Sequence, residues 1–365
     1  MRILVLANNI NGLMSFRIEV MQAMVERGYE VYVSAPWDKR YDEQVKELGL
    51  QIINTPVDRR GINPITDLVL INRYKRMIKM VSPDVVLSYT IKPNLYGGLA
   101  CKWANIPQLV NITGLGTAVE NPGMLQLFAI KLYKFCLKNV NVMFFQNKAN
   151  MKFCRERGMI SGRPELLPGS GVNLSYFTST EMPKGDIVKF ICIGRAMKQK
   201  GTGDYLDMAE VIKKEFPNTE FHVLGACNDG EYEERIRMMH DKGTIIYNGV
   251  TTDVRPYIQN VHCTIHASYY PEGMSNVLLE SCASARAIIT TARPGCGEIV
   301  EDRVNGFITR PHDVEDLCRQ VRKFLNLSPE EREAMGRAAR KKVESEFDRQ
   351  IVVNKYMKEI EQLKS

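Results

Sequence analysis

The chain has 365 residues, of which 44% are hydrophobic and 25% are charged, and its formal net charge is +7. These fractions are typical of globular proteins and exclude disordered, collagen-like and coiled-coil chains, and the length predicts two domains. The longest apolar runs, such as Ile3 to Ala7 and Val142 to Phe145, fall far short of the ~20 residues of a membrane-spanning helix, and Met1 to Leu6 lacks a signal-peptide layout. We therefore expect a soluble, cytoplasmic protein.

Runs rich in Val, Ile and Leu alternate with helical patterns in the first half of the chain. Their nearly continuous apolarity is typical of parallel strands that are buried on both faces. The predicted strands are Arg2 to Ala7, Glu30 to Ala35, Gln51 to Asn54, Asp84 to Tyr89, Gln108 to Ile112 and Val140 to Phe145, and the helices between them include Met14 to Gly28, Pro64 to Val81 and Pro93 to Asn105. This alternation predicts a doubly wound α/β domain.

A second series of strands follows a stretch of turn-forming residues, Leu167 to Asn173, which predicts a hinge. Its strands are expected at Val188 to Ile193, Glu220 to Leu224, Thr244 to Tyr247, His262 to His266 and Ala287 to Thr290, and helices close the chain at Val314 to Leu325, Glu330 to Phe347 and Ile351 to Leu363. The pattern predicts a second domain of the same class.

The fold class predicted is therefore α/β, with two Rossmann-like, doubly wound domains that face each other across a cleft. The N-terminal domain would span residues 1–166, a hinge linker 167–185 and the C-terminal domain 186–346, and a C-terminal helix in 347–365 could pack back on the N-terminal domain. Ligands of open α/β sheets bind beyond the carboxyl ends of the strands, so we expect the active site in the cleft.

Positive charge is concentrated in the first half of the chain. Residues 1–165 hold 22 Lys and Arg against 13 Asp and Glu, whereas the remaining 200 residues hold 27 against 29. The helical stretches Asn72 to Lys79 and Lys131 to Lys138 mix cations with apolar side chains. Such helices can lie on an anionic membrane or bind a phosphate-rich ligand, but an ordinary solvated face has the same composition, and the pattern alone leaves both interpretations open.

The first motif with a chemical interpretation is Gly194-Arg195-Ala196-Met197-Lys198-Gln199-Lys200-Gly201, directly after a predicted strand. Two cations on a loop at the carboxyl end of a strand suit a diphosphate, because Arg195 can bind two oxygens at once and Lys200 acts as a point charge. A surface loop that is merely rich in Arg and Lys is the ordinary alternative.

The second motif is Glu272-Gly273-Met274-Ser275-Asn276-Val277-Leu278-Leu279-Glu280. A helix that starts at about Ser275 would direct its free N–H groups at an anion, and Gly273 would let the backbone come close. Glu272 in the loop and Glu280 in the helix would then accept hydrogen bonds from hydroxyls on opposite sides of a diphosphate. A loop Glu and an exposed helix Glu without a ligand remain the ordinary alternative.

Together, Gly194-Arg195-x4-Lys200-Gly201 and Glu272-x7-Glu280 resemble the donor site of the family-4 retaining glycosyltransferases of the GT-B fold. The resemblance covers the whole chain and includes Gly249 to Tyr257, Pro294 to Glu301 and Val304 to Phe307. In the first half, Tyr89 to Gly97 and Asn111 to Gly116 are similar to the subgroup that extends polyprenyl-diphosphate-linked glycans for bacterial surface polysaccharides, such as capsule or lipopolysaccharide.

The resemblance implies roles for particular residues. Arg195 and Lys200 would bind the donor diphosphate, Glu280 the ribose, and Glu272 the transferred sugar, so that the catalytic residues would be Glu272, Arg195 and Lys200. The other implied donor-binding residues are Gly12, Gly194, Asn248, Gly249, Val250, Gly273, Met274, Ser275 and Asn276. The nucleobase would rest near Asn248 to Val250, and Gly12 would close on the phosphates from the other domain.

No metal or other cofactor is expected. Arg, Lys and helix N–H groups can stabilise the leaving-group charge where it develops, and the sequence lacks the Asp-x-Asp motif by which many metal-dependent sugar transferases hold a cation. Many family members carry a His near the transferred sugar, but all five His residues here follow residue 221. Asn111, Thr113, Gly114 and Lys92 are instead expected to position the sugar or the acceptor, and no catalytic base is assigned.

Two other interpretations of short motifs are set aside. His262 and His266 lie four residues apart on one strand face, but they lack a nearby carboxylate or Cys at metal-binding spacing. Gly114-Leu115-Gly116-Thr117-Ala118-Val119 echoes a dinucleotide-binding motif, but it lacks the third Gly and does not follow the first strand.

The sequence thus predicts a metal-independent, retaining hexosyl- or N-acetylhexosaminyltransferase. Its donor would be a nucleoside-diphosphate sugar, most simply a UDP-sugar, and its acceptor a polyprenyl-diphosphate-linked saccharide. We expect peripheral contact with the anionic inner face of the plasma membrane and no nucleic-acid partner. The alternatives are a UDP-sugar 2-epimerase on the same scaffold and a non-catalytic nucleotide-sugar-binding protein.

Overall fold

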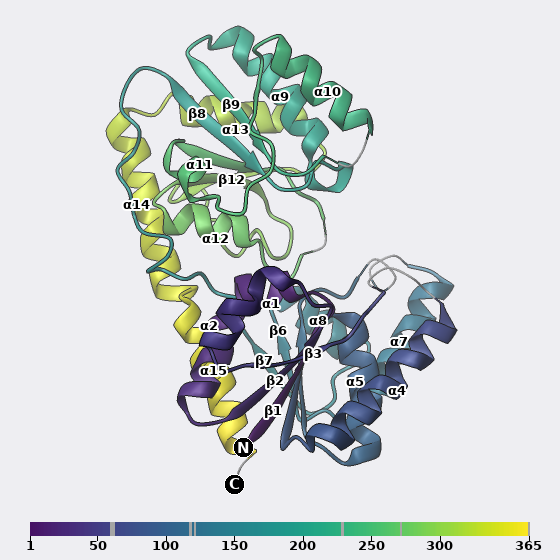
Figure 1. Cartoon of the computed structure of the whole chain (residues 1–365). Helices are drawn as coiled ribbons and strands as arrows, with labels where there is room; N and C mark the ends of the chain where they lie inside the picture. The colour runs from purple at the N-terminus through teal and green to yellow at the C-terminus, as the bar shows by residue number, and fades with distance from the viewer. Residues whose placement is uncertain (59–62, 117–118, 120–121, 228–229, 271, 364–365) are drawn as a thin grey trace. The chain divides into compact units, whose positions relative to one another are not determined.

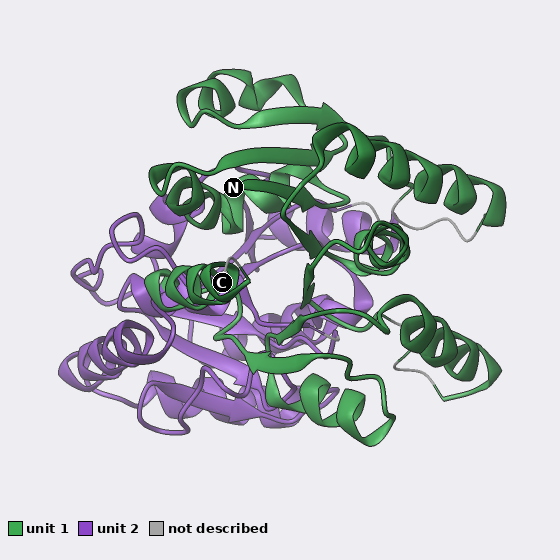
Figure 2. Ribbon diagram, turned by 90° about the horizontal axis from the view of Figure 1, so that it is seen from below, with its two compact units in different colours: residues 1–171, 349–365 green, residues 172–348 purple. Residues whose placement is uncertain are grey.

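A computed structural model describes residues 1–58, 63–116, 119, 122–227, 230–270 and 272–363. The chain forms two compact units (Figures 1 and 2). Unit 1 comprises Met1–Gly171 and Arg349–Ser365, and unit 2 comprises Val172–Asp348. The predicted linker, residues 167–185, therefore spans the division between the units.

Unit 1 is built on a parallel sheet that has seven strands within the described residues, in the order β3-β2-β1-β4-β5-β6-β7. The strands are β1 (Arg2–Leu6), β2 (Glu30–Ala35), β3 (Gln51–Asn54), β4 (Val85–Tyr89), β5 (Gln108–Ile112), β6 (Val142–Phe145) and β7 (Arg163–Leu166). In register, Val5 of β1 lies between Val33 of β2 and Leu87 of β4. The order reverses at β1 and β4, as in doubly wound folds.

Helices cover both faces of this sheet (Figure 1). They are α1 (Ile10–Phe16), α2 (Ile18–Glu26), α3 (Asp42–Glu47), α4 (Pro64–Val81), α5 (Ile91–Ala104), α7 (Met124–Cys136), α8 (Lys148–Glu156) and α15 (Arg349–Gln362), with a 3₁₀ turn, η1, at Lys39–Tyr41. Successive strand residues point to opposite faces. Ile3 and Val5 therefore pack with α2 and α15, whereas Leu4 and Leu6 pack with α4, α5 and α7.

Helix α15 belongs to unit 1 although it ends the chain (Figure 2). The ring of its Tyr356 packs 4.5 Å from the ring of Phe144, and the amide of Asn111 on β5 donates a hydrogen bond to the Tyr356 hydroxyl. At the start of the helix, Nη1 of Arg349 lies 2.8 Å from both carboxylate oxygens of Glu19. These contacts join the last helix to the core of unit 1.

Unit 2 has a parallel sheet with six strands in the described residues, in the order β10-β9-β8-β11-β12-β13. Its strands are β8 (Val188–Ile193), β9 (Thr219–Leu224), β10 (Ile246–Tyr247), β11 (Cys263–His266), β12 (Ala287–Thr291) and β13 (Gly306–Thr309). Its helices are η2 (Lys198–Lys200), α9 (Thr202–Glu215), α10 (Gly230–Asp241), α11 (Arg255–Gln259), α12 (Asn276–Ala283), α13 (Val314–Leu325) and α14 (Pro329–Glu346). Both halves thus confirm the predicted α/β class.

Arg286 fixes the segment before β8 to unit 2. Its side chain is fully buried, and its guanidinium donates to the carbonyl oxygens of Thr180, Glu181 and Gln259, at distances of 2.7 to 3.0 Å. Burial lowers the pKa of Arg286 to about 10. The backbone of residues 180–181 is therefore held against unit 2 by hydrogen bonds to a buried cation.

Two details differ from the sequence prediction. The predicted helix Met14 to Gly28 is broken at Arg17, whose φ of −137° is not helical and whose guanidinium lies 5.2 Å from the ring centroid of Tyr89. Strands β7 and β13 were not predicted. Strand β7 contains Pro164 and lies at the edge of its sheet, where a missing N–H is tolerated, and β13 is a short segment that begins at Gly306.

Candidate active site

In unit 2, the predicted donor residues gather at the point where the strand order reverses. Strands β8 and β11 are neighbours, but the chain visits β9 and β10 on one side of β8 before it returns to β11 on the other. The loops that leave the carboxyl ends of such a strand pair diverge and leave a crevice for ligands. Arg195 follows β8, and Glu272 lies in the loop after β11.

Three glycines bring the loops on one side of this crevice together. Gly225, which follows β9, has a φ of +141°, and a Cβ added to it would lie 1.9 Å from the carbonyl oxygen of Gly194. The N–H of Gly225 donates to the carbonyl of Gly249 at 2.7 Å. The loop of Asn248 to Val250 is therefore adjacent to the loop of Gly194, and a side chain at Gly225 would separate them.

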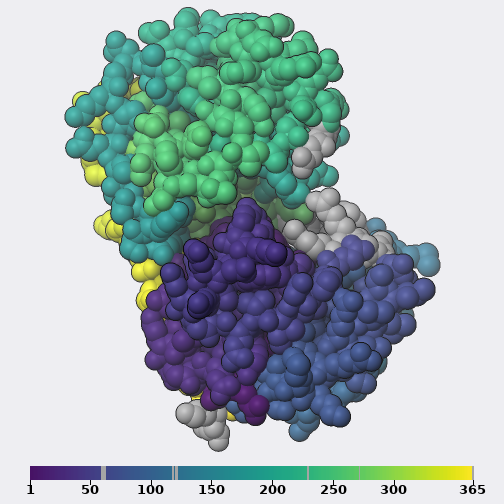
Figure 3. Space-filling model, in the orientation of Figure 1, coloured from purple at the N-terminus to yellow at the C-terminus, as the bar shows by residue number. Residues whose placement is uncertain are grey.

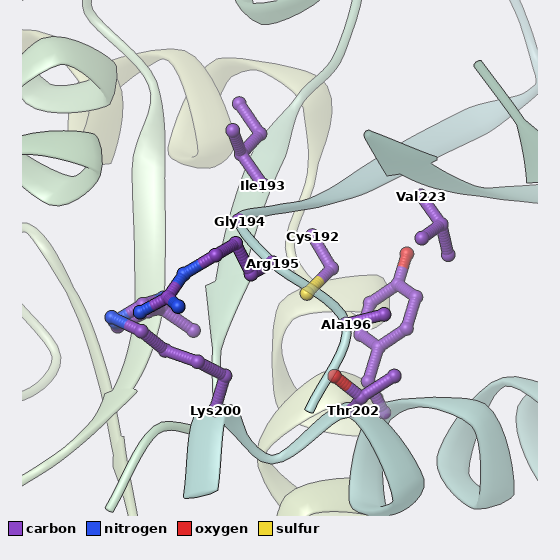
Figure 4. A pocket seen from close by; sticks show the side chains of 10 residues that line it. Cys192, Ile193, Gly194, Arg195, Ala196, Lys200, Thr202 and Val223 are labelled. Atoms are coloured by element: carbon purple, nitrogen blue, oxygen red, sulfur yellow. The ribbon is translucent and has the colours of Figure 1, made fainter. Parts of the chain in front are cut away.

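Arg195 and Lys200 line one pocket, together with Thr202, Tyr205 and His266. Figure 4 shows the side chains of Arg195 and Lys200 extending to the same side of that pocket. Gly201 has a φ of +69°, and a Cβ on it would lie 2.3 Å from the carbonyl oxygen of Ala267. Only glycine therefore allows the end of η2 to contact the end of β11 this closely.

Glu272 is bound directly to Lys200. Its Oε1 accepts a hydrogen bond from Lys200 Nζ and lies 3.4 Å from Nε2 of His266 and 3.5 Å from Oγ of Ser268. The side chain of Glu272 is 12% exposed. Burial alone would raise the pKa of Glu272, but the ring of His266 and the ammonium of Lys200 next to the carboxylate outweigh that effect and lower the pKa to about 2. Glu272 is therefore ionised at neutral pH.

Helix α12 begins beside Glu272. Ser275 is its N-cap, as predicted, and its backbone N–H donates to the carbonyl of Gly295 at 2.8 Å. Gly295 has a φ of +84°, and a Cβ there would lie 2.9 Å from the carbonyl oxygen of Gly273. The loop after β12 thus packs on the loop of Glu272. The N–H groups of the first turn, starting at Asn276, lack acceptors within the helix and can bind an anion.

The remaining predicted donor residues also lie at this edge. The amide of Asn248 donates to the carbonyl of Ile246 at 3.2 Å and lies 3.3 Å from Nδ1 of His222. Val250 is exposed at 70%, and Met274 is buried. Glu280 is half-buried on α12, eight residues after Glu272. The assignment of a nucleobase to residues 248–250 and of a ribose to Glu280 stays a prediction.

Other predicted site residues belong to unit 1. Gly12 lies in α1, after β1. Nζ of Lys92 lies 2.7 Å from Oδ1 of Asp67, so its charge is already paired. Asn111 is fully buried and bound to Tyr356, a contact that gives it a structural role in the core of unit 1. Thr113 and Gly114 are half-buried just after β5. The predicted roles of these residues toward sugar or acceptor remain predictions.

His266 is the contact of Glu272 that the sequence interpretation missed. The sequence considered it only as a metal ligand with His262, and the structure gives the two residues different surroundings. Both ring nitrogens of His262 are used, because Nδ1 accepts from Lys189 N–H at 3.0 Å and Nε2 lies 3.1 Å from the carbonyl of Pro183. In the described part of the chain, no three His, Cys, Asp or Glu side chains cluster as a metal site.

Comparison with known proteins identifies the family. The family model for glycosyl transferases group 1 matches residues 179–342, and the model for glycosyl transferase 4-like domains matches residues 2–147. Together the two models cover most of both halves of the chain, which is therefore a glycosyltransferase. A relative from Campylobacter jejuni is N,N'-diacetylbacillosaminyl-diphospho-undecaprenol alpha-1,3-N-acetylgalactosaminyltransferase. This glycosyltransferase is 26% identical to it over 377 residues, and the similarity covers 98% of each chain.

Solved structures give the same result for the fold. A glycosyltransferase from Rickettsia africae superposes with a TM-score of 0.81 at 18% identity, over 99% of this chain and 98% of the other. The Anabaena protein Alr3699/HepE, solved in complex with UDP and glucose, superposes with a TM-score of 0.79 at 15% identity and covers 99% of each chain. The two α/β domains of this glycosyltransferase are thus those of the GT-B fold, as predicted.

Proposed function

We propose that this glycosyltransferase moves a hexose or N-acetylhexosamine from a UDP-sugar to a lipid-diphosphate-linked saccharide in the assembly of a bacterial surface glycan. The assignment of a UDP-sugar donor depends on one observation. Arg195 and Lys200 line one pocket where the strand order of unit 2 reverses, and Glu272 is bonded to Lys200 beside the N-terminus of α12. Two cations and a helix N-terminus suit a diphosphate, and a carboxylate suits sugar hydroxyls.

The proposed mechanism is electrostatic. Negative charge develops on the distal phosphate as the bond to the sugar breaks, and Arg195, Lys200 and the first N–H groups of α12 would stabilise it without a metal ion. The acceptor would attack from the face that the phosphate leaves, with a phosphate oxygen taking its proton, so that the anomeric configuration is retained. The α-linkage named for the Campylobacter jejuni relative agrees with retention from an α-linked nucleotide sugar.

The acceptor half of the proposal rests on that relative. Its name specifies a saccharide linked through a diphosphate to undecaprenol, and the similarity extends over 98% of both chains. An acceptor with a polyprenyl tail remains at the bilayer, so the enzyme has to work at the membrane surface. None of the helices in the described ranges combines the length and apolarity needed to cross a bilayer.

Unit 1 has a surface suited to peripheral membrane contact. Helices α4, α5 and α7 cover one face of its sheet, and the part of that surface contributed by α4 and α5 is blue in Figure 3. On α7, Met124 is 89% exposed, Phe128 64% and Phe135 61%, and Lys131 and Lys134 are exposed on the same helix. Exposed apolar side chains among lysines are typical of helices that lie in an anionic membrane interface.

A second basic helix continues the same layer. On α4, Ile65 and Leu68 are exposed at 72% and 60%, and Arg76 and Lys79 are exposed further along the helix. We infer peripheral attachment to the inner face of the plasma membrane through α4 and α7. Together these two helices define the membrane-facing surface of unit 1.

A transfer assay tests the proposed function. The purified chain is incubated with UDP-N-acetylgalactosamine, UDP-N-acetylglucosamine, UDP-galactose or UDP-glucose and an undecaprenyl-diphosphate-linked saccharide, in the presence of EDTA. We expect one donor to extend the acceptor, and an α-linkage in the product by NMR. Release of free sugar and UDP without acceptor would instead indicate a hydrolysing epimerase, and an inverted linkage would exclude the retaining mechanism.

A further inference from the structure

Three donor groups converge on one oxygen of Glu272. Lys200 Nζ donates to Oε1, while His266 Nε2 and Ser268 Oγ lie 3.4 and 3.5 Å from the same atom. Within the described residues, Nε2 of His266 is buried and has no hydrogen-bond partner. Buried polar groups without partners are rare, so this nitrogen needs an explanation. The simplest one is that Lys200 occupies the position at Oε1 that His266 would otherwise use.

The Lys200–Glu272 pair also conflicts with the proposed use of Lys200. A donor diphosphate adds negative charge next to the pocket that Arg195 and Lys200 line. While the ammonium of Lys200 remains bound to Glu272, its charge is largely neutralised. A Lys200 ammonium that moves to the phosphate takes a cation away from the buried carboxylate of Glu272, which is costly unless another donor replaces it.

We propose that Lys200 changes partners when the donor binds, from Glu272 to the diphosphate, and that His266 then donates its Nε2–H to Oε1 of Glu272. Glu272 thereby stays oriented for the sugar hydroxyls. This inference rests on the proposed donor function of the pocket. His266 would act as a positioning residue, through its contact with Glu272.

The position of His266 suits this role. It is the last residue of β11, it is 4% exposed, and its carbonyl accepts a hydrogen bond from the hydroxyl of Thr290 at 2.9 Å. Ser268 suits it less well, because its hydroxyl lies 3.4 Å from the carbonyl of Gln199 and accepts the N–H of Tyr270 at 3.2 Å. His266 thus combines a fixed backbone with an uncommitted donor.

Calorimetric titration with UDP tests the exchange of partners. Glu272→Gln removes the charge that holds Lys200, so we expect UDP to bind on the order of five- to tenfold more tightly than to the wild type. In a Lys200→Gln background the same change should leave UDP affinity unaltered, because there is no ammonium to release. Glu301→Gln, which removes an exposed carboxylate of unit 2, is the control for net charge.

The role of His266 is tested in the same way. His266→Phe keeps a ring but removes the N–H, and we expect it to weaken UDP binding several-fold in the wild-type background and not at all with Glu272→Gln. His266→Gln keeps an N–H donor and should restore the affinity. If His266 had a purely structural role, His266→Phe would weaken UDP binding equally in the wild type and in Glu272→Gln. Thermal unfolding of each variant confirms that it is folded.

The outcomes separate the inference from the proposed function. If UDP binds the wild type but Glu272→Gln binds it equally well or more weakly, the exchange of partners is wrong and the donor site stands. Equal losses from His266→Phe in both backgrounds would exclude His266 as the replacement donor. If UDP does not bind the wild type, the UDP-donor function and this inference both fail.

Discussion

Oε1 of Glu272 accepts a hydrogen bond from Nζ of Lys200, across 72 positions of sequence. Each residue belongs to a different motif, and the two motifs follow neighbouring strands of one sheet. The bond shows that the two motifs are in contact in the folded chain. It also means that a change in either residue alters the electrostatic environment of the other.

Replacement of Glu272 by Ala should separate catalysis from nucleotide binding. The loss of the carboxylate removes the group proposed to bind the transferred sugar, so we expect the transfer rate to fall on the order of a hundred- to a thousandfold. UDP affinity should not decrease, because UDP lacks the sugar. Initial rates with the lipid-linked acceptor and calorimetry with UDP measure the two effects. Full activity of the variant would remove Glu272 from the site.

Arg286→Met should destabilise unit 2. The substitution removes the donors for the buried carbonyls of Thr180, Glu181 and Gln259, and we expect a loss of about 3 kcal/mol or more in the free energy of unfolding. Urea denaturation measures this change. The control is Arg337→Ala, whose exposed ion pair with Glu333 should contribute less than about 1 kcal/mol. Equal stability of both variants would contradict the anchoring role.

The free energy of unfolding should depend on pH because His262 takes up a proton more readily in the unfolded chain. Burial lowers its pKa to about 4, and the charges of Arg332, Arg286 and Lys189 act in the same direction. The unfolded chain therefore binds a proton near the ordinary pKa of about 6.5 that the folded chain excludes. The stabilising contribution is complete above about pH 6.5 and is lost as the pH falls from there toward about 4.

We expect this loss to be about 2 kcal/mol at about pH 5, measured as the change in the free energy of unfolding relative to about pH 7.5. In His262→Gln, which retains an amide but does not titrate, the same pH change should have a smaller effect. An identical pH dependence in wild type and variant would assign the effect to other groups.

Membrane binding should depend on the apolar face of α7. Phe128→Asp places a charge on the membrane-facing surface, and we expect binding to phosphatidylglycerol vesicles to fall about tenfold or more in a sedimentation assay. Met238→Asp, at a residue of unit 2 that is 48% exposed, is the matched control and should have no effect. Wild-type binding should also weaken in high salt. Unchanged binding of the Phe128 variant would exclude α7 as the contact.

The sequence was informative where function depends on residues that are close along the chain. Gly194 to Gly201 and Glu272 to Glu280 each follow a buried strand, and the carboxyl ends of parallel strands share one edge, so two local patterns were enough to predict that the two motifs lie close together. The strands β2 (Glu30–Ala35), β3 (Gln51–Asn54), β5 (Gln108–Ile112) and β8 (Val188–Ile193) were predicted with the bounds that the structure has.

The contacts that were not predicted join residues far apart in sequence. Tyr356 meets Asn111 across 245 positions, and Arg286 meets Thr180 across 106. His266 could have been related to Glu272, since it ends the strand before the Glu272 loop. The proximity of His266 to Lys200, however, depends on how the end of η2 packs against the end of β11. Gly201 permits this packing, and no local sequence pattern predicts it.

A thermal-shift measurement with UDP, GDP, ADP and NAD in the presence of EDTA tests the central claim most directly, because a ligand of the folded state raises its melting temperature. The account predicts that UDP stabilises the wild type and Lys198→Ala, an exposed neighbour on the same loop, but not Arg195→Ala. Stabilisation by NAD alone, by none of these ligands, or by UDP equally in the Arg195 variant would contradict it.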